Sequence, residues 1–168
     1  MVTLRGLGRD LALAAILAAS FFICPAASAQ PTSPAAKPAA IDRNGVLILV
    51  RGTLLALDQA NKTGNYTVLR DLGSPGFQVN TAARLSEIFV GLRKDNVDLS
   101  GVAALDPQLS LLPQIEADGT MHMTGFFPSV PKQVNFNLAY APVQGQWRLF
   151  AISVGIESSS PVAPAPAA

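Results

Sequence analysis

The spacing of apolar residues changes near Val102, and this change restricts the chain to folds that combine helices with a sheet. Before that point, apolar residues recur every three or four positions, the period of an amphipathic helix: Val46, Val50, Leu54 and Leu57. From Val102 onward, apolar and polar residues alternate between turn residues, as in antiparallel strands. The order predicts an α+β fold with N-terminal helices packed on the apolar face of an antiparallel sheet.

Two helices are predicted first along the chain. The longer one has Asp42 or Asn44 available as its N-cap and is weakened by Gly52 in its interior. A short helix is predicted over residues 66–72. We expect it to end there because Gly73, Ser74 and Pro75 follow in succession.

A third helix is predicted within residues 80–96, with Asn80 or Thr81 as its cap. Its apolar stripe consists of Leu85, Ile88, Phe89 and Leu92. Its charged residues are predicted to form a solvated face: Arg84, Glu87, Arg93 and Lys94.

Two hairpins are predicted in the second half, turning at Asp118-Gly119 and at Gln144-Gly145. We expect a three-residue loop in each, with the glycine in the left-handed conformation. In the second hairpin this register places Leu138 opposite Phe150. A two-residue loop would mix apolar and polar residues on both faces, so the pattern favours three residues.

This register divides the side chains between two faces of the sheet. The first hairpin contributes Ile115, Met121, Met123 and Phe127 to the apolar face. The second contributes Val134, Phe136, Leu138, Tyr140, Phe150, Ile152 and Val154. The opposite face receives Asn135, Asn137, Ala139, Trp147 and Leu149.

The first 29 residues have the pattern of a secretory signal peptide. Arg5 and Arg9 precede an apolar run at 11–23, and Ala27-Ser28-Ala29 supplies the small residues that signal peptidase requires. The run is shorter than the roughly 20 residues that span a bilayer, which argues against an uncleaved anchor. We therefore expect a periplasmic or secreted protein with no membrane span after cleavage.

Cys24 is the only cysteine, and cleavage after Ala29 would remove it. Its lipidation is the alternative, but Phe22 and Ile23 occupy positions where lipid-modifying enzymes normally meet small side chains. The mature chain would have no thiol and one histidine, so no metal site and no cofactor are expected.

Cleavage would leave ten basic and ten acidic side chains, interspersed along the chain. A nucleic-acid-binding protein normally carries a basic stripe, so nucleic acid is not an expected partner. A Pro/Ala-rich linker is predicted over 30–40 and a similar disordered tail over 158–168, which leaves 41–157 as the folded domain.

Two runs in this order resemble the nuclear-transport-factor-two-like superfamily, whose fold is the cystatin-like α+β cone. They are "ALDQANKTGNYTVLRDLGSPGF" at 56–77 and "GQWRLFAISV" at 145–154. The resemblance implies a strongly curved sheet around a helix, a conical cavity that often binds a ligand, and a tendency to dimerise through the sheet. The runs also resemble secreted proteobacterial proteins without an assigned activity.

Catalytic members of that superfamily include ketosteroid isomerases and scytalone dehydratases, and they place carboxylates or a His-Asp pair in the cavity. The weak candidates for such a role here are His122, Asp98 and Asp106. Alternation along the strand directs His122 away from the apolar face, and the acidic residues occupy positions that water normally solvates.

A non-catalytic domain is therefore the preferred hypothesis, binding a small apolar ligand or an envelope protein through its cavity or sheet. The candidate ligand-binding residues are Phe136, Tyr140, Trp147 and Phe150. The alternatives are an isomerase- or dehydratase-like enzyme acting on a small hydrophobic substrate, and a structural homodimeric subunit.

Overall fold

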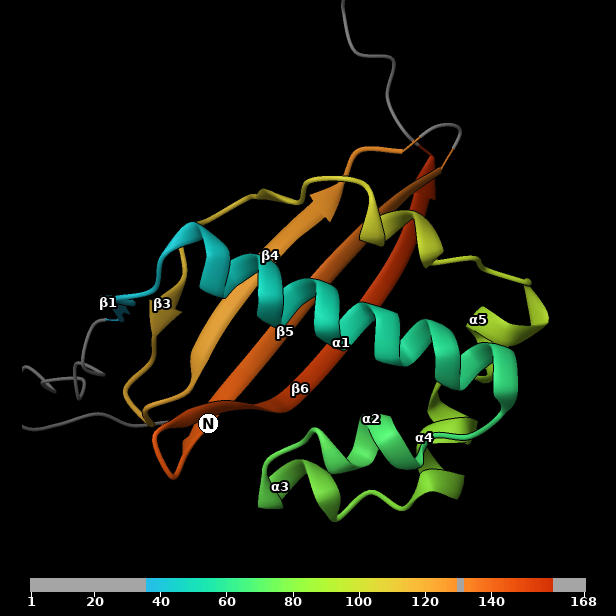
Figure 1. Cartoon of the computed structure of the whole chain (residues 1–168), viewed down its shortest axis with the longest axis horizontal. Coiled ribbons are helices and arrows are strands. Elements are labelled where there is room, and N and C mark those ends of the chain that lie inside the picture. The colour runs from blue at the N-terminus through green and yellow to red at the C-terminus, as the bar shows by residue number, and fades with distance from the viewer. Residues whose placement is uncertain (1–35, 130–131, 159–168) are drawn as a thin grey trace, which may run out of the picture. The chain divides into compact units, whose positions relative to one another are not determined.

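The computed structural model describes residues 36–129 and 132–158, and it shows an antiparallel sheet with helix α1 (Arg43–Thr63) lying across one face (Figure 1). The predicted signal peptide and Cys24 lie outside the described residues, as does most of the predicted tail. The predicted α+β class is confirmed. The other helices are α2 (Thr67–Asp71), α3 (Pro75–Gln78), α4 (Ala82–Ile88), α5 (Val90–Lys94) and the 3-10 helix η1 (Ser100–Ala103).

Six strands form the sheet, in the order β1-β3-β4-β5-β6, and β2 pairs with β4 beside β3. The strands are β1 (Lys37–Pro38), β2 (Gln108–Leu109), β3 (Gln114–Ile115), β4 (Met121–Phe127), β5 (Lys132–Val143) and β6 (Gln146–Ser158). Strand β1 lies within the predicted linker, so residues before 41 take part in the sheet.

Helix α1 forms as its sequence predicts. Asp42 is the N-cap, because its carboxylate accepts a hydrogen bond from the Gly45 N–H at 2.7 Å. Gly64 ends the helix with a φ of 72°, a conformation that favours glycine. The four periodic apolar residues named above are all buried in the core between the helix and the sheet.

The short second helix is confirmed as α2, but the next two elements differ from the prediction. Residues 75–78 form α3, a turn that sequence reasoning missed. The predicted third helix is interrupted at Phe89, whose ψ of 14° separates α4 from α5. Phe89 is buried and stacks on Tyr66, as a residue of the apolar stripe can. Ile88 is 50% exposed, so the assignment of Ile88 to the apolar stripe is wrong.

The first hairpin has the predicted three-residue loop. Ile115 pairs with Met121, and Gly119 in the loop has a φ of 84°. Buried residues alternate with partly buried or exposed ones along β4, and the buried positions include Met121, Met123 and Phe127. This part of the apolar face is therefore confirmed.

The second hairpin corrects the predicted register. Its loop has two residues, Gln144 and Gly145, both with positive φ, which is the geometry of a type I′ turn. An irregularity next to Tyr140 then inserts Phe150 as an extra residue, because Tyr140 pairs with Leu149 while Ala139 pairs with Ala151.

This bulge exchanges the roles of two neighbouring residues. Leu149 is 2% exposed and belongs to the core, whereas Phe150 is 43% exposed and lies against Gly76 of α3. Beyond the bulge the predicted faces return, since Ile152 pairs with Leu138 and Val154 pairs with Phe136. A two-residue loop alone would have moved Ile152 and Val154 to the polar face. The bulge returns them to the apolar face.

Side chains from α1, from the sheet and from the helices beside them form one core. Its largest fully buried members include Tyr66, Tyr140, Phe127 and Leu54. No helix within the described ranges has a long enough apolar stretch to cross a membrane.

Candidate apolar binding groove

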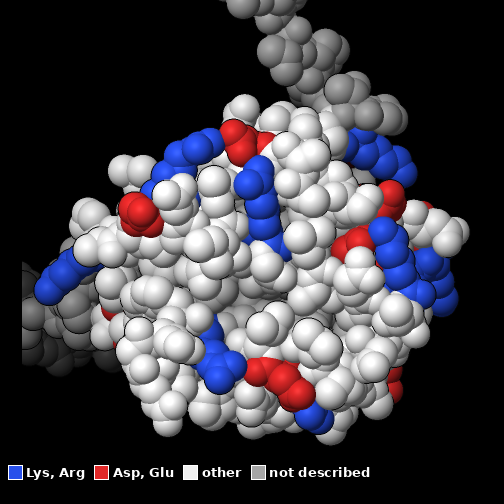
Figure 2. All heavy atoms as spheres, viewed as in Figure 1, with Lys and Arg blue, Asp and Glu red and all other residues white. Residues whose placement is uncertain are grey.

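An apolar groove opens on the surface between α1, the end of α2 and the β5–β6 hairpin. It has a volume of about 330 Å³ and is lined by Ile48, Leu49, Gly52, Thr53, Leu72, Tyr140, Trp147 and Leu149. We call it the Tyr140 groove. Figure 2 views the molecule from the α1 side, where much of the surface is uncharged and most acidic and basic side chains lie toward the margin.

The rim and the floor of the Tyr140 groove differ in exposure. Ile48 on α1 is 71% exposed and Leu72 after α2 is 43% exposed, so two large aliphatic side chains stand beside the opening. Tyr140 and Leu149 are buried beneath them. Exposed aliphatic side chains around a concave apolar surface are typical of a binding site for an apolar group.

The hydroxyl group of Tyr140 is already satisfied by the protein. It donates a hydrogen bond to the Leu49 carbonyl at 2.9 Å, and the Thr53 hydroxyl lies 2.9 Å away and donates to it in turn. Burial raises the pKa of Tyr140, so the phenol stays neutral. The groove therefore offers a ligand apolar surface without an unpaired phenol group.

The structure brings together two of the four predicted ligand-binding residues. The two-residue loop places Trp147 opposite Pro142 and on the same face as Tyr140, so both line the groove. Phe136 instead lies in the core, 5.7 Å from the ring of Phe127. Phe150 lies against α3, because the bulge displaces it from the apolar face.

The three candidate catalytic residues lie on separate elements. His122 is on β4, on the face away from the core, and its Nε2 lies 3.2 Å from the Thr120 hydroxyl. Asp106 is exposed and pairs with Arg43 and Arg51 of α1, each at 2.8 Å. Asp98 follows α5 and pairs with Lys62 at 2.9 Å. The structure does not bring these three side chains together.

Hydrogen bonding lowers the pKa of Asp98 to about 2. The first cause is the Ser100 N–H, which donates to the carboxylate at 3.0 Å, and Lys62 adds to it. Because the pKa is lower in the folded than in the unfolded state, Asp98 stabilises the fold above about pH 4, and this contribution is lost as the pH falls toward 2. An NMR titration of the carboxyl carbon should show a midpoint near 2, and Lys62→Met should raise it. A wild-type midpoint near 4 would contradict these contacts.

Sequence reasoning missed a buried carboxylate on α1. The side chain of Asp58 is 1% exposed. One oxygen accepts the Leu99 N–H at 3.0 Å, and the other accepts Lys62 at 2.8 Å. Through its bond to Leu99, Asp58 therefore holds the segment before η1 against α1. The i, i+4 spacing of Asp58 and Lys62 was the available signal for the pair.

A second polar cluster surrounds Arg93, which was predicted to be solvated. Its guanidinium donates to the Ser86 hydroxyl at 2.6 Å and to the Tyr66 hydroxyl at 3.2 Å, and it lies 5.5 Å from the centre of the Tyr66 ring. The assignment of Arg93 to a solvated face is therefore wrong. Arg93 instead ties α5 to α4 and to the residue that precedes α2.

Within residues 36–129 and 132–158, no three His, Cys, Asp or Glu side chains are grouped so that they could hold a metal ion. Comparisons of the chain with protein-family models, curated proteins and solved structures gave no match.

Proposed function

We propose that this protein is a non-catalytic binding domain whose Tyr140 groove takes a small apolar ligand. The observation that carries the proposal is the groove itself, which combines exposed Ile48 and Leu72 with a buried, internally bonded tyrosine. The separation of His122, Asp98 and Asp106 favours binding over isomerase or dehydratase chemistry. Secretion to the periplasm and a cystatin-like cone of the nuclear-transport-factor-two-like kind belong to the same proposal, supported by the N-terminal sequence and the order of elements.

Trp147 gives a direct measurement, because it is the only tryptophan in the chain and it lines the groove. We expect the apolar fluorophore 1-anilinonaphthalene-8-sulfonate to bind and to quench the emission of Trp147 by energy transfer. Ile48→Ser should weaken this binding by roughly tenfold, since removing about 50 Å² of apolar contact costs on the order of 1 kcal/mol.

Val79→Ser is the matched control. Val79 is 79% exposed, follows α3 and is not among the residues that line the groove, so its loss should leave binding unchanged. Neither substitution should change stability by more than about 0.5 kcal/mol, because both side chains are exposed. Equal weakening by the two variants, or no quenching of Trp147, would overturn the proposed site.

A further inference from the structure

The C-terminal half of β6 lies at the outer edge of the described sheet. Strand β6 is last in the sheet order, and β5 lies on its other side. Near its start, β6 is covered by the segment before α3, since Gly73 bridges Leu149 and the Ser74 N–H donates to the Leu149 carbonyl at 2.7 Å. In the described parts of the chain, no strand pairs with the outer edge of residues 151–157.

This edge lacks the features that usually prevent strands from associating. Natural edge strands carry lysine or proline, are short, or contain a bulge. Strand β6 has 13 residues, and its bulge lies before residue 151. Glu157 is the one charged residue of the stretch, which reads Ala151, Ile152, Ser153, Val154, Gly155, Ile156, Glu157. Three β-branched aliphatic residues at alternate positions favour pairing with another strand.

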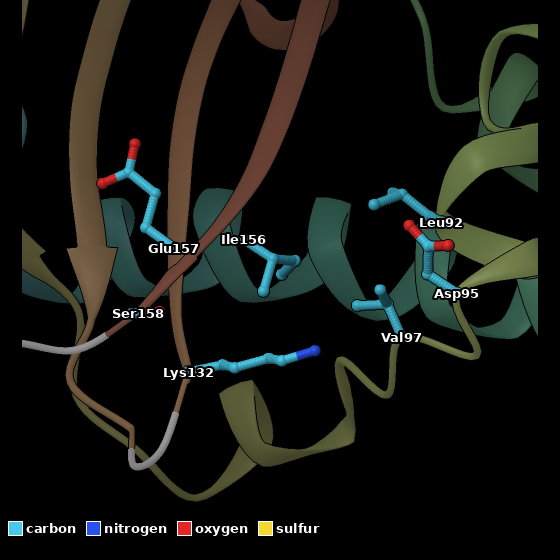
Figure 3. A pocket seen from close by; sticks show the side chains of 7 residues that line it. All are labelled: Leu92, Asp95, Val97, Lys132, Ile156, Glu157 and Ser158. Atoms are coloured by element: carbon cyan, nitrogen blue, oxygen red, sulfur yellow. The ribbon is translucent and has the colours of Figure 1, made fainter.

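A hollow of about 490 Å³ lies beside the same edge. Figure 3 shows Ile156 projecting from β6 toward Leu92 and Val97, with Lys132 beneath it, while Glu157 points away. Three apolar side chains, Ile156 of β6 together with Leu92 and Val97, therefore line part of the hollow, and polar side chains, Asp95 and Lys132 among them, line the rest. A strand added next to β6 would find space there for an aliphatic side chain.

We propose that this edge pairs with β6 of a second copy of the chain, antiparallel about a two-fold axis at Val154. In that register Val154 faces its own copy and Ile152 faces Ile156 of the second copy, so all inner-face pairs are β-branched. Ile152 of the second copy then lies beside the hollow next to Ile156. Small residues face each other on the outer side, where Ser153 opposes Gly155 of the second copy.

The charges permit this pairing. Glu157 opposes the uncharged Ala151 of the second copy, and the two Glu157 residues lie six positions apart along the strands. At about 3.3 Å per residue this separation is about 20 Å, well beyond the screening length of about 8 Å in physiological salt. No like charges oppose each other within the paired stretch.

The area of contact sets the expected strength. Seven paired residues span about 23 Å, and a single strand edge with one filled hollow covers less than the roughly 800 Å² per partner of a standard stable interface. We therefore expect a reversible dimer that forms in the micromolar range or above. Sedimentation velocity of the purified protein from about 1 µM to 1 mM should show the change from monomer to dimer.

Gly155→Lys should raise the dimer dissociation constant at least tenfold. A Cβ at Gly155 meets no atom within 4 Å, so the folded monomer accepts the side chain. In the dimer, the two lysines would lie within about 8 Å of each other across the axis. Ser153→Lys places charges in the same region from another exposed position and should have the same effect.

Asn137→Lys is the matched control. Asn137 is exposed on the same face of the sheet, but it lies on β5 and not at the edge, and it should leave the dissociation constant unchanged. Weakening by Asn137→Lys would indicate association through the face of the sheet and overturn the proposal. A dimer that survives both edge lysines, or a protein that stays monomeric throughout the concentration range, would also overturn it.

Val154→Cys tests the position of the axis. In a Cys24→Ser background, oxidation of the dimer should join the two copies, because directly opposed residues of antiparallel strands lie within the Cα separation of a disulfide. A dimer that cannot be cross-linked at this position would contradict the proposed register.

Discussion

Replacing Leu149 with alanine should lower the free energy of unfolding by about 2–5 kcal/mol, whereas Phe150→Ala should lower it by only about 1 kcal/mol. Leu149 is buried in the core, and its truncation leaves a cavity there. Phe150 is 43% exposed and loses mainly its contact with α3. Urea denaturation followed by circular dichroism measures both values.

The comparison tests the bulge in β6 directly. The register with a three-residue loop predicts the opposite ranking, with Phe150 in the core and Leu149 on the outer face. A larger loss for Phe150→Ala than for Leu149→Ala would therefore show that the hairpin lacks the irregularity next to Tyr140.

Asp58→Ala is the second substitution with a large expected effect, about 2–4 kcal/mol. It removes the acceptor of the buried Leu99 N–H and one of the two carboxylates that bind Lys62. An unsatisfied buried donor costs about 1–3 kcal/mol, and the lost contact with the charged amine adds to this. Thermal and urea unfolding should both show the loss.

Asp106→Ala is the control for this prediction. Asp106 also bonds two basic side chains, but its own side chain is 63% exposed, so its removal should cost less than about 1 kcal/mol. Equal losses of unfolding free energy for the two variants would mean that the contribution of Asp58 to stability does not depend on its burial.

Local signals predicted most of the helical half. Asp42 and the apolar period of α1 are contained within one stretch of sequence, and each produced the expected structure. The interruption at Phe89 was not predictable in this way, because it accompanies a stacking contact with Tyr66, which lies 23 positions earlier. Contacts between residues this far apart in the sequence determine where an amphipathic helix is interrupted.

The candidate groove was predicted only in part. Tyr140 and Trp147 were selected as amphipathic residues near a hairpin end, and the structure places both at one groove. The contributions of Ile48 and Leu72 were missed because they come from other elements, and sequence pattern does not show which helix passes over a hairpin. Phe150 was placed on the wrong face because loop length and bulge together set the register, whereas Phe136 lies on the predicted face and is buried in the core.

The opposite border of the sheet sets a limit on how large an assembly can grow. Strand β1 is two residues long and contains Pro38, which has no N–H to offer a neighbour. A filament requires each subunit to extend the sheet in both directions, and the sheet formed by the described residues offers an extensible border on one side only. The dimer proposed through β6 would therefore be a closed pair that does not extend into an ordered fibre.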